Sequence, residues 1–330
     1  MENQATHPAD AAALDRLLAV EPVWHEVERA ATAVDLADHT LLHAGPRIRL
    51  DAIAQPVLNS AATAALYEGW AETHEAAEHA IRNGTIRLLP AQDHGAVVPL
   101  AAVLSPGMWV QIVIDSRNPG RRAVSPFNGG SGPAMRLGQA GPAVVAHLRW
   151  LNGPFAACVA RALDRGIPLI PIADAALAAG DDCHGRTIHG TALLVERLST
   201  RLGEDGGADK ARRFLEKSPG FFLNLWMAAS QCILAAGEGP GSSLVTAIGA
   251  NGGEVGLRIG AMPGRWFTAP AEPPRGLLDP GITEGERLGA IGDSAVVDAL
   301  GLGAMAMNHA PEQAKALGPF MPAPAEALSA

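Results

Sequence analysis

The sequence predicts an α+β protein with mixed sheets in two lobes and a small helical subdomain. Apolar residues follow helical spacing first, alternate as in strands from residue 85, return to helical spacing from residue 142, and alternate again after residue 243. Helices and strands are therefore grouped rather than interleaved as in a regular βαβ fold. We expect residues 1–141 to form an N-terminal α+β lobe, 142–236 a mainly helical subdomain, and 237–330 a C-terminal α+β lobe.

The N-terminal lobe begins with two helical regions. Residues 11–34 carry apolar side chains at roughly helical intervals, with a break at Glu21-Pro22, and a short apolar run follows at 41–46. The second helical region extends from Asp51 to Asn83-Gly84, a sequence that favours the end of a helix. Alternating patterns then predict strands at 86–89, 96–104 and 108–114, and glycine and proline predict a loop over 117–132.

The central part is predicted to be helical and the last part to return to strands. Helices are expected over 142–166, 173–179, 187–202, 210–217 and 221–236. The last of these is apolar on nearly all sides, which predicts that it is buried. Strands are expected at 244–248 and 254–259, joined by a hairpin turn at Asn251-Gly252-Gly253, with a further short strand at 265–268.

Composition excludes several classes of protein. The net charge is −9 and aromatic residues make up only 4%, so the chain lacks the basic clusters and stacking rows of a nucleic-acid-binding protein. Three cysteines in an unpatterned arrangement do not build a disulfide framework. The polar first ten residues do not resemble a signal peptide, and no apolar run is long enough to span a membrane. We expect a cytoplasmic protein. Its low charged fraction of 18% indicates surface buried between subunits, and we expect a homo-oligomer.

The most concentrated group of reactive side chains lies between Gly180 and Arg186. Asp182, Cys183, His184 and Arg186 precede a predicted helix, whose exposed backbone N–H groups bind anions and lower the pKa of a nearby thiol. Cys183 or His184 is then a candidate nucleophile or base, and Arg186 a candidate anion ligand. The alternative is a helix cap in a polar loop, with Cys183 as a small buried residue.

Other polar residues are candidates in less distinctive surroundings. The glycine turn before Ser242 and Ser243 lacks the lysine of a phosphate-binding loop, but its hydroxyls suit a carbonyl or carboxylate. Asn128, in a glycine-rich loop, and the following Arg136 suit an anion, although a plain turn fits equally well. Asn224 lies in the apolar helix and needs partners there, as a structural bridge or as a site residue.

Several histidines and one aspartate have simpler interpretations. His43 and His94 each lie in a turn after an apolar run, and each is a candidate site residue, His94 as a base and His43 as a ligand for the substrate, although a lone histidine is more often structural. His74 and His79 belong to a helix whose spacing does not match a zinc motif, so a solvated helix face is favoured. The segment Gly292-Asp293-Ser294 fits a helix N-cap. No metal and no cofactor are expected, since the chain also lacks a dinucleotide fingerprint.

Nine motifs occur together in a fixed order over His43–Pro311, nearly the whole chain. They are Leu42-His43-Ala44-Gly45-Pro46, Glu68-Gly69-Trp70-Ala71, Gly180-Asp181-Asp182-Cys183-His184 with Arg186, Phe221-Phe222-Leu223-Asn224-Leu225, Gly241-Ser242-Ser243-Leu244, Asn251-Gly252, Gly256 with Arg258, Trp266-Phe267 with Ala269-Pro270, and Ile291-Gly292-Asp293-Ser294-Ala295. In these motifs the chain resembles the YlbE/YahG-like bacterial family.

The resemblance implies a three-part α+β architecture and a role in a protein complex. Members of the family are associated with an FdrA-like protein, and one such group is linked to the oxamate carbamoyltransferase of anaerobic allantoin breakdown. The resemblance therefore implies a transferase subunit that acts on a small ureido or amide acid, with phosphate as a possible second ligand. It adds Asn251 and Arg258 to the candidate residues. A stand-alone hydrolase of such compounds and a non-catalytic scaffold for the FdrA-like partner remain alternatives.

The chain departs from the family pattern in two candidate loops. Members tend to have Pro-Cys-His-Glu-His where this chain has Pro90-Ala91-Gln92-Asp93-His94, and Asn-Glu-Gly where it has Asn128-Gly129-Gly130. The loss of a cysteine, a histidine and a glutamate predicts a divergent subgroup with a different substrate or a non-catalytic role.

Overall fold

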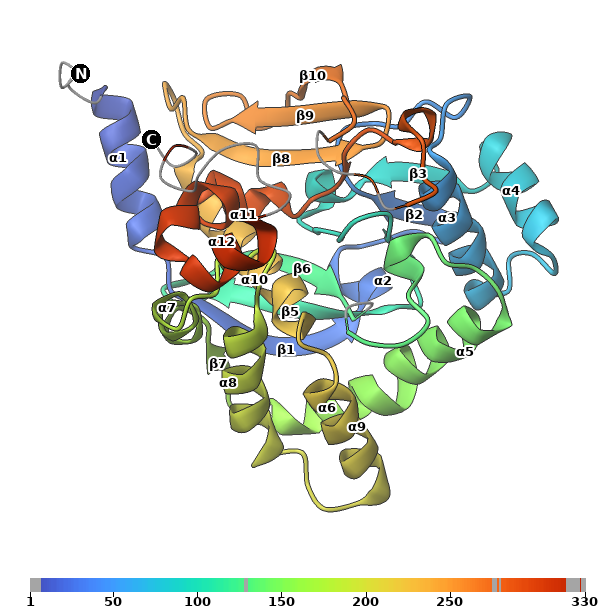
Figure 1. The fold of residues 1–330 in the computed structure, drawn as a ribbon, viewed down its shortest axis with the longest axis horizontal. Helices are drawn as coiled ribbons and strands as arrows, with labels where there is room; N and C mark the ends of the chain where they lie inside the picture. The colour runs from blue at the N-terminus through green and yellow to red at the C-terminus, as the bar shows by residue number, and fades with distance from the viewer. Residues whose placement is uncertain (1–6, 128–129, 275–277, 279, 319–326, 328–330) are drawn as a thin grey trace.

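The computed structural model describes residues 7–127, 130–274, 278, 280–318 and 327 (Figure 1). Within these residues the chain forms many short helices and three separate sheets, which confirms the predicted α+β class. The boundaries at residues 141 and 236 stay a prediction.

The first sheet is antiparallel and has the strand order β6-β5-β1-β7. Its strands are β1 (Pro22–Arg29), β5 (Trp109–Asp115), β6 (Asn118–Pro126) and β7 (Ile167–Pro168). The helical prediction for Pro22–Arg29 and the loop prediction for Asn118–Pro126 were both wrong. β1 is a strand because its backbone forms hydrogen bonds with β5. β5 is distant in the sequence, so the local pattern of β1 does not predict this pairing. β6 tolerates Pro119 because it is an edge strand, where a missing backbone donor costs little.

The second sheet joins β3 (Arg87–Pro90), β2 (Thr40–His43) and β4 (Val103–Leu104), with β2 and β3 parallel. Helices α3 (Gln55–Glu68) and α4 (His74–Arg82) connect these parallel strands and bury alanine-rich faces in the same core. His74 forms an ion pair with Glu78 on the surface of α4, as expected for a solvated helix face. Of the strand predicted over 96–104, only β4 forms. The backbone N–H of Val98 donates to the side chain of Asp293 instead of to a neighbouring strand.

The third sheet is antiparallel and has the order β10-β9-β8-β11. Its strands are β8 (Val245–Asn251), β9 (Glu254–Ile259), β10 (Phe267–Pro270) and β11 (Ile291–Gly292). The structure confirms the hairpin between β8 and β9, where Asn251 Oδ1 accepts hydrogen bonds from the backbone of Gly253 and Glu254.

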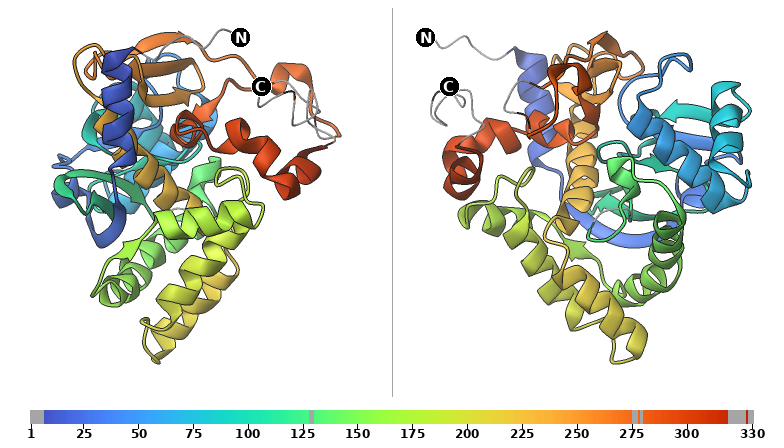
Figure 2. Two further views of the ribbon diagram at one scale, coloured as in Figure 1. Left: turned by 90° about the vertical axis from the view of Figure 1, so that its left-hand side faces the viewer. Right: turned by 45° about the vertical axis from the view of Figure 1, so that its right-hand side comes forward.

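Helices fill the remaining space and one of them is central. Helix α10 (Phe221–Leu234) has 13 of its 14 residues buried, which confirms the sequence expectation, and it packs against β5, β6, β1 and β8. Figures 1 and 2 show it in the middle of the molecule. The other helices are α1 (Pro8–Leu18), α2 (Ala30–Ala33), α5 (Pro142–Trp150), α6 (Ala156–Ala162), α7 (Ile170–Ala178), α8 (Ile188–Ser199), α9 (Gly206–Glu216), α11 (Ala295–Ala299) and α12 (Pro311–Leu317).

Short 3₁₀ turns and one π-helical turn complete the described structure. They are η1 (Ala91–His94), η2 (Met135–Leu137), the π turn η3 (Leu151–Phe155), η4 (Ala235–Gly237), η5 (Glu284–Glu286) and η6 (Gly303–His309). In the described part of the chain no single helix is long and apolar enough to cross a bilayer. The sharply bent pair Gly206–Glu216 and Phe221–Gly237 meets the length and composition criteria only when it is taken together.

A buried carboxylate joins the second and third sheets. Asp293 is fully buried and accepts hydrogen bonds from Gly45 N at 2.9 Å, Val98 N at 3.0 Å and Gln92 Nε2 at 2.6 Å. Gln92 Nε2 also donates to the carbonyl of Ile248 in β8. Gly45 has a φ of +74° and approaches β8 so closely that a Cβ would lie 2.6 Å from the carbonyl carbon of Ala250.

The helix N-cap that the sequence places in Gly292-Asp293-Ser294 is Ser294, the residue before α11, although its side chain makes no cap hydrogen bond. The Asp293 carboxylate has a different role and bonds to three other segments. Burial raises the pKa of Asp293 to about 7, although the three N–H donors and the charge of Arg258 oppose this shift.

We compare the free energy of unfolding of the wild type with that of Asp293→Asn. We predict that the wild type minus variant difference falls by about 2–3 kcal/mol between pH 5 and pH 8. The stabilisation from a raised carboxyl pKa is complete below the ordinary value of 3.8 and is lost as the pH rises through about 7. Asparagine does not titrate, so its effect on hydrogen bonding is a constant offset. Urea unfolding at the two pH values measures the difference, and a pH-independent difference would contradict the prediction.

Candidate functional site

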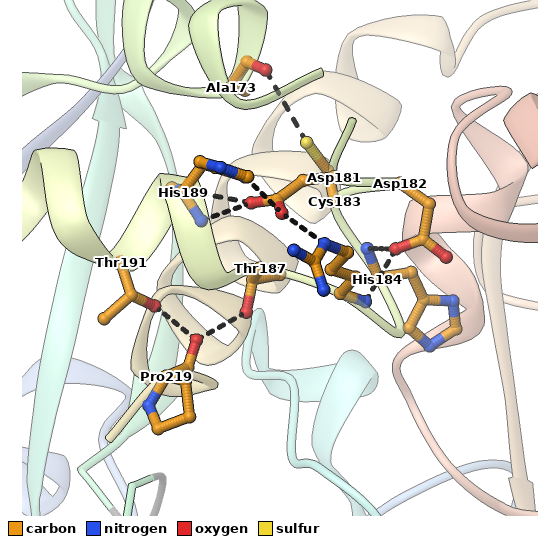
Figure 3. Close-up of polar contacts among 11 residues, drawn as sticks. Ala173, Asp181, Asp182, Cys183, His184, Thr187, His189, Thr191 and Pro219 are labelled. Atoms are coloured by element: carbon orange, nitrogen blue, oxygen red, sulfur yellow. Dashed lines mark hydrogen bonds and ion pairs between the residues drawn. The ribbon is translucent and has the colours of Figure 1, made fainter. Parts of the chain in front are cut away.

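The Gly180–Arg186 stretch is organised by its two aspartates (Figure 3). Asp181 is fully buried, and its Oδ2 accepts hydrogen bonds from the backbone N–H groups of His189 and Gly190 at 2.8 and 3.0 Å. These groups belong to the first turn of α8, where a carboxylate is favoured by unpaired donors and by the helix dipole. Its Oδ1 lies 3.3 Å from Arg186 Nε. Asp181 therefore anchors the start of α8.

Asp182 folds the turn itself. Its Oδ1 accepts hydrogen bonds from the backbone N–H groups of His184 and Arg186 at 2.9 and 2.8 Å, and its carbonyl accepts one from Gly303 N. Cys183 sits at the top of this turn with a φ of +59°. Both hydrogen bonds stabilise a backbone conformation that L-residues otherwise avoid.

The Cys183 thiol is buried against α7. Its Sγ donates to the carbonyl of Ala173 at 3.6 Å, and only 1% of the residue is exposed. Burial, together with the charges of Asp181 and Asp182, raises the pKa of the thiol to about 12. A thiol that stays protonated near neutral pH is a poor nucleophile, so the geometry favours the packing role.

His184 connects the stretch to the C-terminal segment. Its Nδ1 lies 2.7 Å from Asp298 Oδ2 at the end of α11. Burial alone lowers the pKa of His184, but the hydrogen bond to Asp298 and the charges of Asp298 and Asp182 outweigh burial, so the pKa is raised. Asp298 Oδ1 also accepts from Ala304 N. The imidazole is thus a partner of η6 and α11 rather than an isolated base.

A polar cavity of about 410 Å³ lies elsewhere, between η1, α10 and β9. It combines two guanidinium groups, two carboxylates and two side-chain amides. The lining residues are Gln92, Asp93, Gly95, Arg122, Gln231, Ala235, Glu238, Arg258, Pro263 and Gly264. This mixture of charges and amides in one hollow is typical of a site for a small polar ligand.

Arg258 is held by more side-chain contacts than Arg122, the other cation of this cavity. Its Nη1 donates to Asp93 Oδ1 at 3.1 Å and its Nη2 to the carbonyl of Gln92 at 3.0 Å. The guanidinium lies 4.9 Å from the ring centre of Trp266, which itself donates to Asp93. Arg258 is 8% exposed, and burial lowers its pKa, opposed by nearby carboxylates. Two hydrogen bonds and one stacked ring fix its orientation.

Three buried polar atoms of the cavity residues have no hydrogen-bond partner within the described residues. They are Gln92 Oε1, Gln231 Oε1 and Arg258 Nε. Buried polar atoms are normally paired, so two acceptors and one donor are available to a ligand here. Glu238 lies beside them, and burial raises its pKa although the charge of Arg258 opposes the shift. Arg122 uses one nitrogen to reach the carbonyl of Ala33.

His43 is fully buried close to this cavity. Its Nδ1 donates to the carbonyl of Ala44 at 2.8 Å, because a carbonyl can only accept, and its Nε2 has no partner among the described residues. Burial lowers the pKa of His43 to about 4, despite the Ala44 hydrogen bond and the charge of Asp93. The ring is therefore neutral near pH 7 and presents an acceptor nitrogen.

The remaining candidates serve other contacts. Asn251 Nδ2 donates to the carbonyl of Pro46, and Asn224 Nδ2 donates to that of Pro126. Ser242 Oγ accepts from Leu244 N, and Ser243 donates to Asp10 of α1 through its backbone and its hydroxyl. These four residues stabilise the hairpin, the centre of α10 and the docking of α1.

Arg136 and His94 lie in two different 3₁₀ turns. Arg136 is half-buried in η2, and burial lowers its pKa. His94 ends η1 and is half-buried, directly after the cavity residues Gln92 and Asp93. Asn128 lies outside the described residues.

The predicted site residues thus fall into separate groups. Within the described residues, no hydrogen bond or ion pair links the Gly180–Arg186 stretch to the Arg258 cavity, and Ser243 lies against α1. Sequence reasoning missed Arg122, Gln231 and Glu238. Gln231 carried a usable signal, because it is a polar residue in the same apolar helix that drew attention to Asn224.

Comparisons with known proteins agree on one family. The model of the family "Oxamate carbamoyltransferase subunit AllG" matches residues 86–294. The AllG protein of Escherichia coli (strain K12) is 32% identical over 320 residues, which cover 94% of this chain and 76% of AllG. The uncharacterized protein YahG of the same strain is 30% identical, over 92% of this chain and 66% of YahG. A solved structure of a conserved protein of unknown function from Enterococcus faecalis V583 has a TM-score of 0.91 at 29% identity, covering 97% of this chain and 78% of that one.

We predict that Asp298→Asn reduces the free energy of unfolding by on the order of 1 kcal/mol at pH 6 and by much less at pH 9. The raised pKa of His184 gives a stabilisation that is complete below its ordinary value of 6.5 and is lost as the pH rises through the folded value. Asparagine keeps an oxygen for Ala304 N but removes the charge. Thermal unfolding across this range measures the effect, and an equal loss at both pH values would argue against it.

Proposed function

Since the chain belongs to the family of the oxamate carbamoyltransferase subunit AllG, we propose that it is a subunit of an enzyme that transfers a carbamoyl or amide group. The proposed substrate is a small ureido or amide acid, with phosphate as the second ligand. The polar cavity around Arg258 is the observation that carries this function. All of its lining residues fall within the part of the chain that the family model matches.

Carbamoyl transfer to phosphate sets clear requirements for the site. An oxygen of phosphate attacks the ureido carbonyl carbon, and the bond from that carbon to the nitrogen of the acid breaks. The departing nitrogen keeps the electron pair and takes up a proton, which leaves an amide acid and carbamoyl phosphate. The site must hold two anions, stabilise the oxyanion that forms on the carbonyl oxygen, and supply the proton.

The cavity residues suit these tasks. Arg258 and Arg122 are assigned to the anionic groups, with the unpartnered Arg258 Nε as the available donor. Gln92 and Gln231 offer free carbonyl oxygens to the N–H groups of a ureido ligand. Glu238 is assigned to proton transfer, because its raised pKa keeps more of the carboxyl protonated near neutral pH.

The Gly180–Arg186 stretch is assigned a positioning role. Its carboxylates are engaged by backbone donors, and His184 is engaged by Asp298. Asp182 and Arg186 hold the turn, and the protonated Cys183 takes no part in bond formation.

An apolar groove supports assembly with another subunit. It encloses about 760 Å³ and is lined in part by α1, the helix that lies at the outer edge of the ribbon in Figure 1. Leu14, Leu18 and Ile170 line it and are 47%, 76% and 43% exposed. Exposed apolar surface of this kind marks interaction sites. The relative AllG is by name a subunit, so we assign the groove to the FdrA-like partner.

We predict that Arg258→Lys lowers kcat/KM of the assembled enzyme by on the order of 10²-fold, since lysine keeps the charge but loses the fixed planar donors. The assay is carbamoyl phosphate formation from an oxalurate-type acid and phosphate after co-purification with the FdrA-like protein. Arg29→Lys is the matched control, because Arg29 also stacks on a tryptophan, Trp109, and donates to a carbonyl, but on the surface of β1.

Cys183→Ser is expected to retain nearly full activity in the same assay. If Cys183→Ser loses activity while Arg258→Lys keeps the activity of the wild type, the assignment of the two regions is reversed. Turnover by the purified single chain would favour the stand-alone hydrolase. Full activity of the complex after Arg258→Lys would favour the scaffold.

We predict that Leu18→Asp weakens co-purification with the FdrA-like protein at least tenfold. The reason is that burying an unpaired carboxylate in the groove costs much free energy of desolvation. Leu288→Asp is the control, since Leu288 is 46% exposed and does not line the groove. Equal recovery of the partner with both variants would exclude the groove as the contact surface.

A further inference from the structure

A second cavity of about 400 Å³ has a different chemical character. It lies between the C-terminal half of α5 and the C-terminal half of α9, within the helical part of the chain. Three of its lining side chains carry rings, which are together named the aromatic floor, and three others are cations. The described residues that line it are Ala146, His147, Trp150, Lys210, Arg213, Phe214 and Lys217, and none of these is acidic.

The cations of this cavity are unusual for the chain. The sequence contains only three lysines in 330 residues, and two of them, Lys210 and Lys217, line the cavity with Arg213. Within the described residues none of these three forms an ion pair, whereas many arginines elsewhere do. The net charge of the chain is −9, so this hollow is a local concentration of unneutralised positive charge.

The rings of the floor pack closely against one another and against two glycines. Trp150 and Phe214 meet edge to face at 5.1 Å, and His147 stacks on Trp150 at 5.8 Å. Gly130 and Gly132 lie close to these rings. A Cβ on Gly130 would lie 2.6 Å from Phe214, and a Cβ on Gly132 would lie 3.2 Å from His147. Burial and the charge of Lys210 lower the pKa of His147, so its ring is neutral near pH 7. The floor is therefore a preorganised aromatic surface.

We propose that this cavity binds a nucleoside phosphate, with the base on Trp150 and the phosphates on Lys210, Arg213 and Lys217. An anion without a ring leaves the aromatic floor unused, and an uncharged ring leaves the three cations unused. A single hollow on an acidic chain offers no continuous basic track, which favours a mononucleotide over a nucleic acid strand. The site is separate from the Arg258 cavity and does not depend on the proposed transferase function.

Lys210 occupies the face of Trp150 in this structure, with its ammonium 4.7 Å from the ring centre. An exposed cation–π contact of this kind is weak, because the ammonium remains well solvated in water. Stacking of a base covers more of the ring face and is the stronger of the two contacts. The base is therefore able to displace the ammonium, and the released Lys210 gains a phosphate partner in exchange.

Isothermal titration of the full chain with ATP, AMP, adenosine and inorganic phosphate tests this site. We expect ATP to bind most tightly, with adenosine and phosphate each at least tenfold weaker. Lys210→Gln/Lys217→Gln should weaken ATP binding at least tenfold, and Lys315→Gln, which removes the one other lysine from the surface of α12, should leave it unchanged. Trp150→Leu should weaken ATP binding but not phosphate binding.

Thermal melts establish that each variant is folded, which matters for Lys217 because it caps the C-terminus of α9. If the double variant fails to fold, Lys210→Gln alone decides. Phosphate binding as tight as ATP binding would overturn the proposal and leave an anion site only. It is also overturned if ATP fails to bind the folded wild type while an acidic peptide binds in a Lys210-dependent manner.

Discussion

The hydrogen bonds of the buried Asp293 carboxylate determine the geometry on which the proposed site depends. They fix Gln92, whose side chain bonds to Asp293 and to β8 and whose carbonyl receives Arg258. Asp93, the next residue, then meets both Arg258 and Trp266. An isolated carboxylate in a protein interior is strongly unfavourable, and three N–H donors offset much of that cost. The same donors hold the second and third sheets together, so the site and the joint between the sheets share one set of bonds.

The Gly180–Arg186 stretch illustrates how a cluster of charged residues can be structural. Asp181 and Asp182 are both nearly inaccessible, and each accepts at least two backbone N–H groups. Without these aspartates the N-terminus of α8 and the left-handed turn at Cys183 would leave donors buried and unpaired. In this stretch the reactive residue types are partners in a tightly folded turn, which also receives the C-terminal segment through Gly303 and Asp298. A catalytic role for them stays a prediction.

Local sequence predicted what depends on local spacing. The α+β class, the burial of α10 and the β8–β9 hairpin follow from periodicity and turn residues. The strands Pro22–Arg29 and Asn118–Pro126 did not, because pairing across the sheet decided their structure. Among candidate site residues, Arg258 and His43 could be named from the sequence. Gln92 could not, since its importance lies in which of its atoms remains unpaired after folding, and Gln231 carried only the general signal of a polar residue in an apolar helix.

Two of the residues in which this chain differs from the family pattern line the Arg258 cavity. Residues that match the pattern, such as Asp293 and Arg258, form the bonds that hold the cavity together. Gln92 and Asp93, which differ from it, line the cavity itself. The pattern places a histidine and a glutamate at these two positions, and this chain has an amide and a shorter carboxylate. An amide binds through hydrogen bonds but does not exchange protons near neutral pH, so Gln92 does not offer the acid–base group that a histidine would offer at this position. Under the proposed transferase function the proton then has to come from another residue, and we assign this task to Glu238, a carboxyl of the cavity whose pKa is raised by burial.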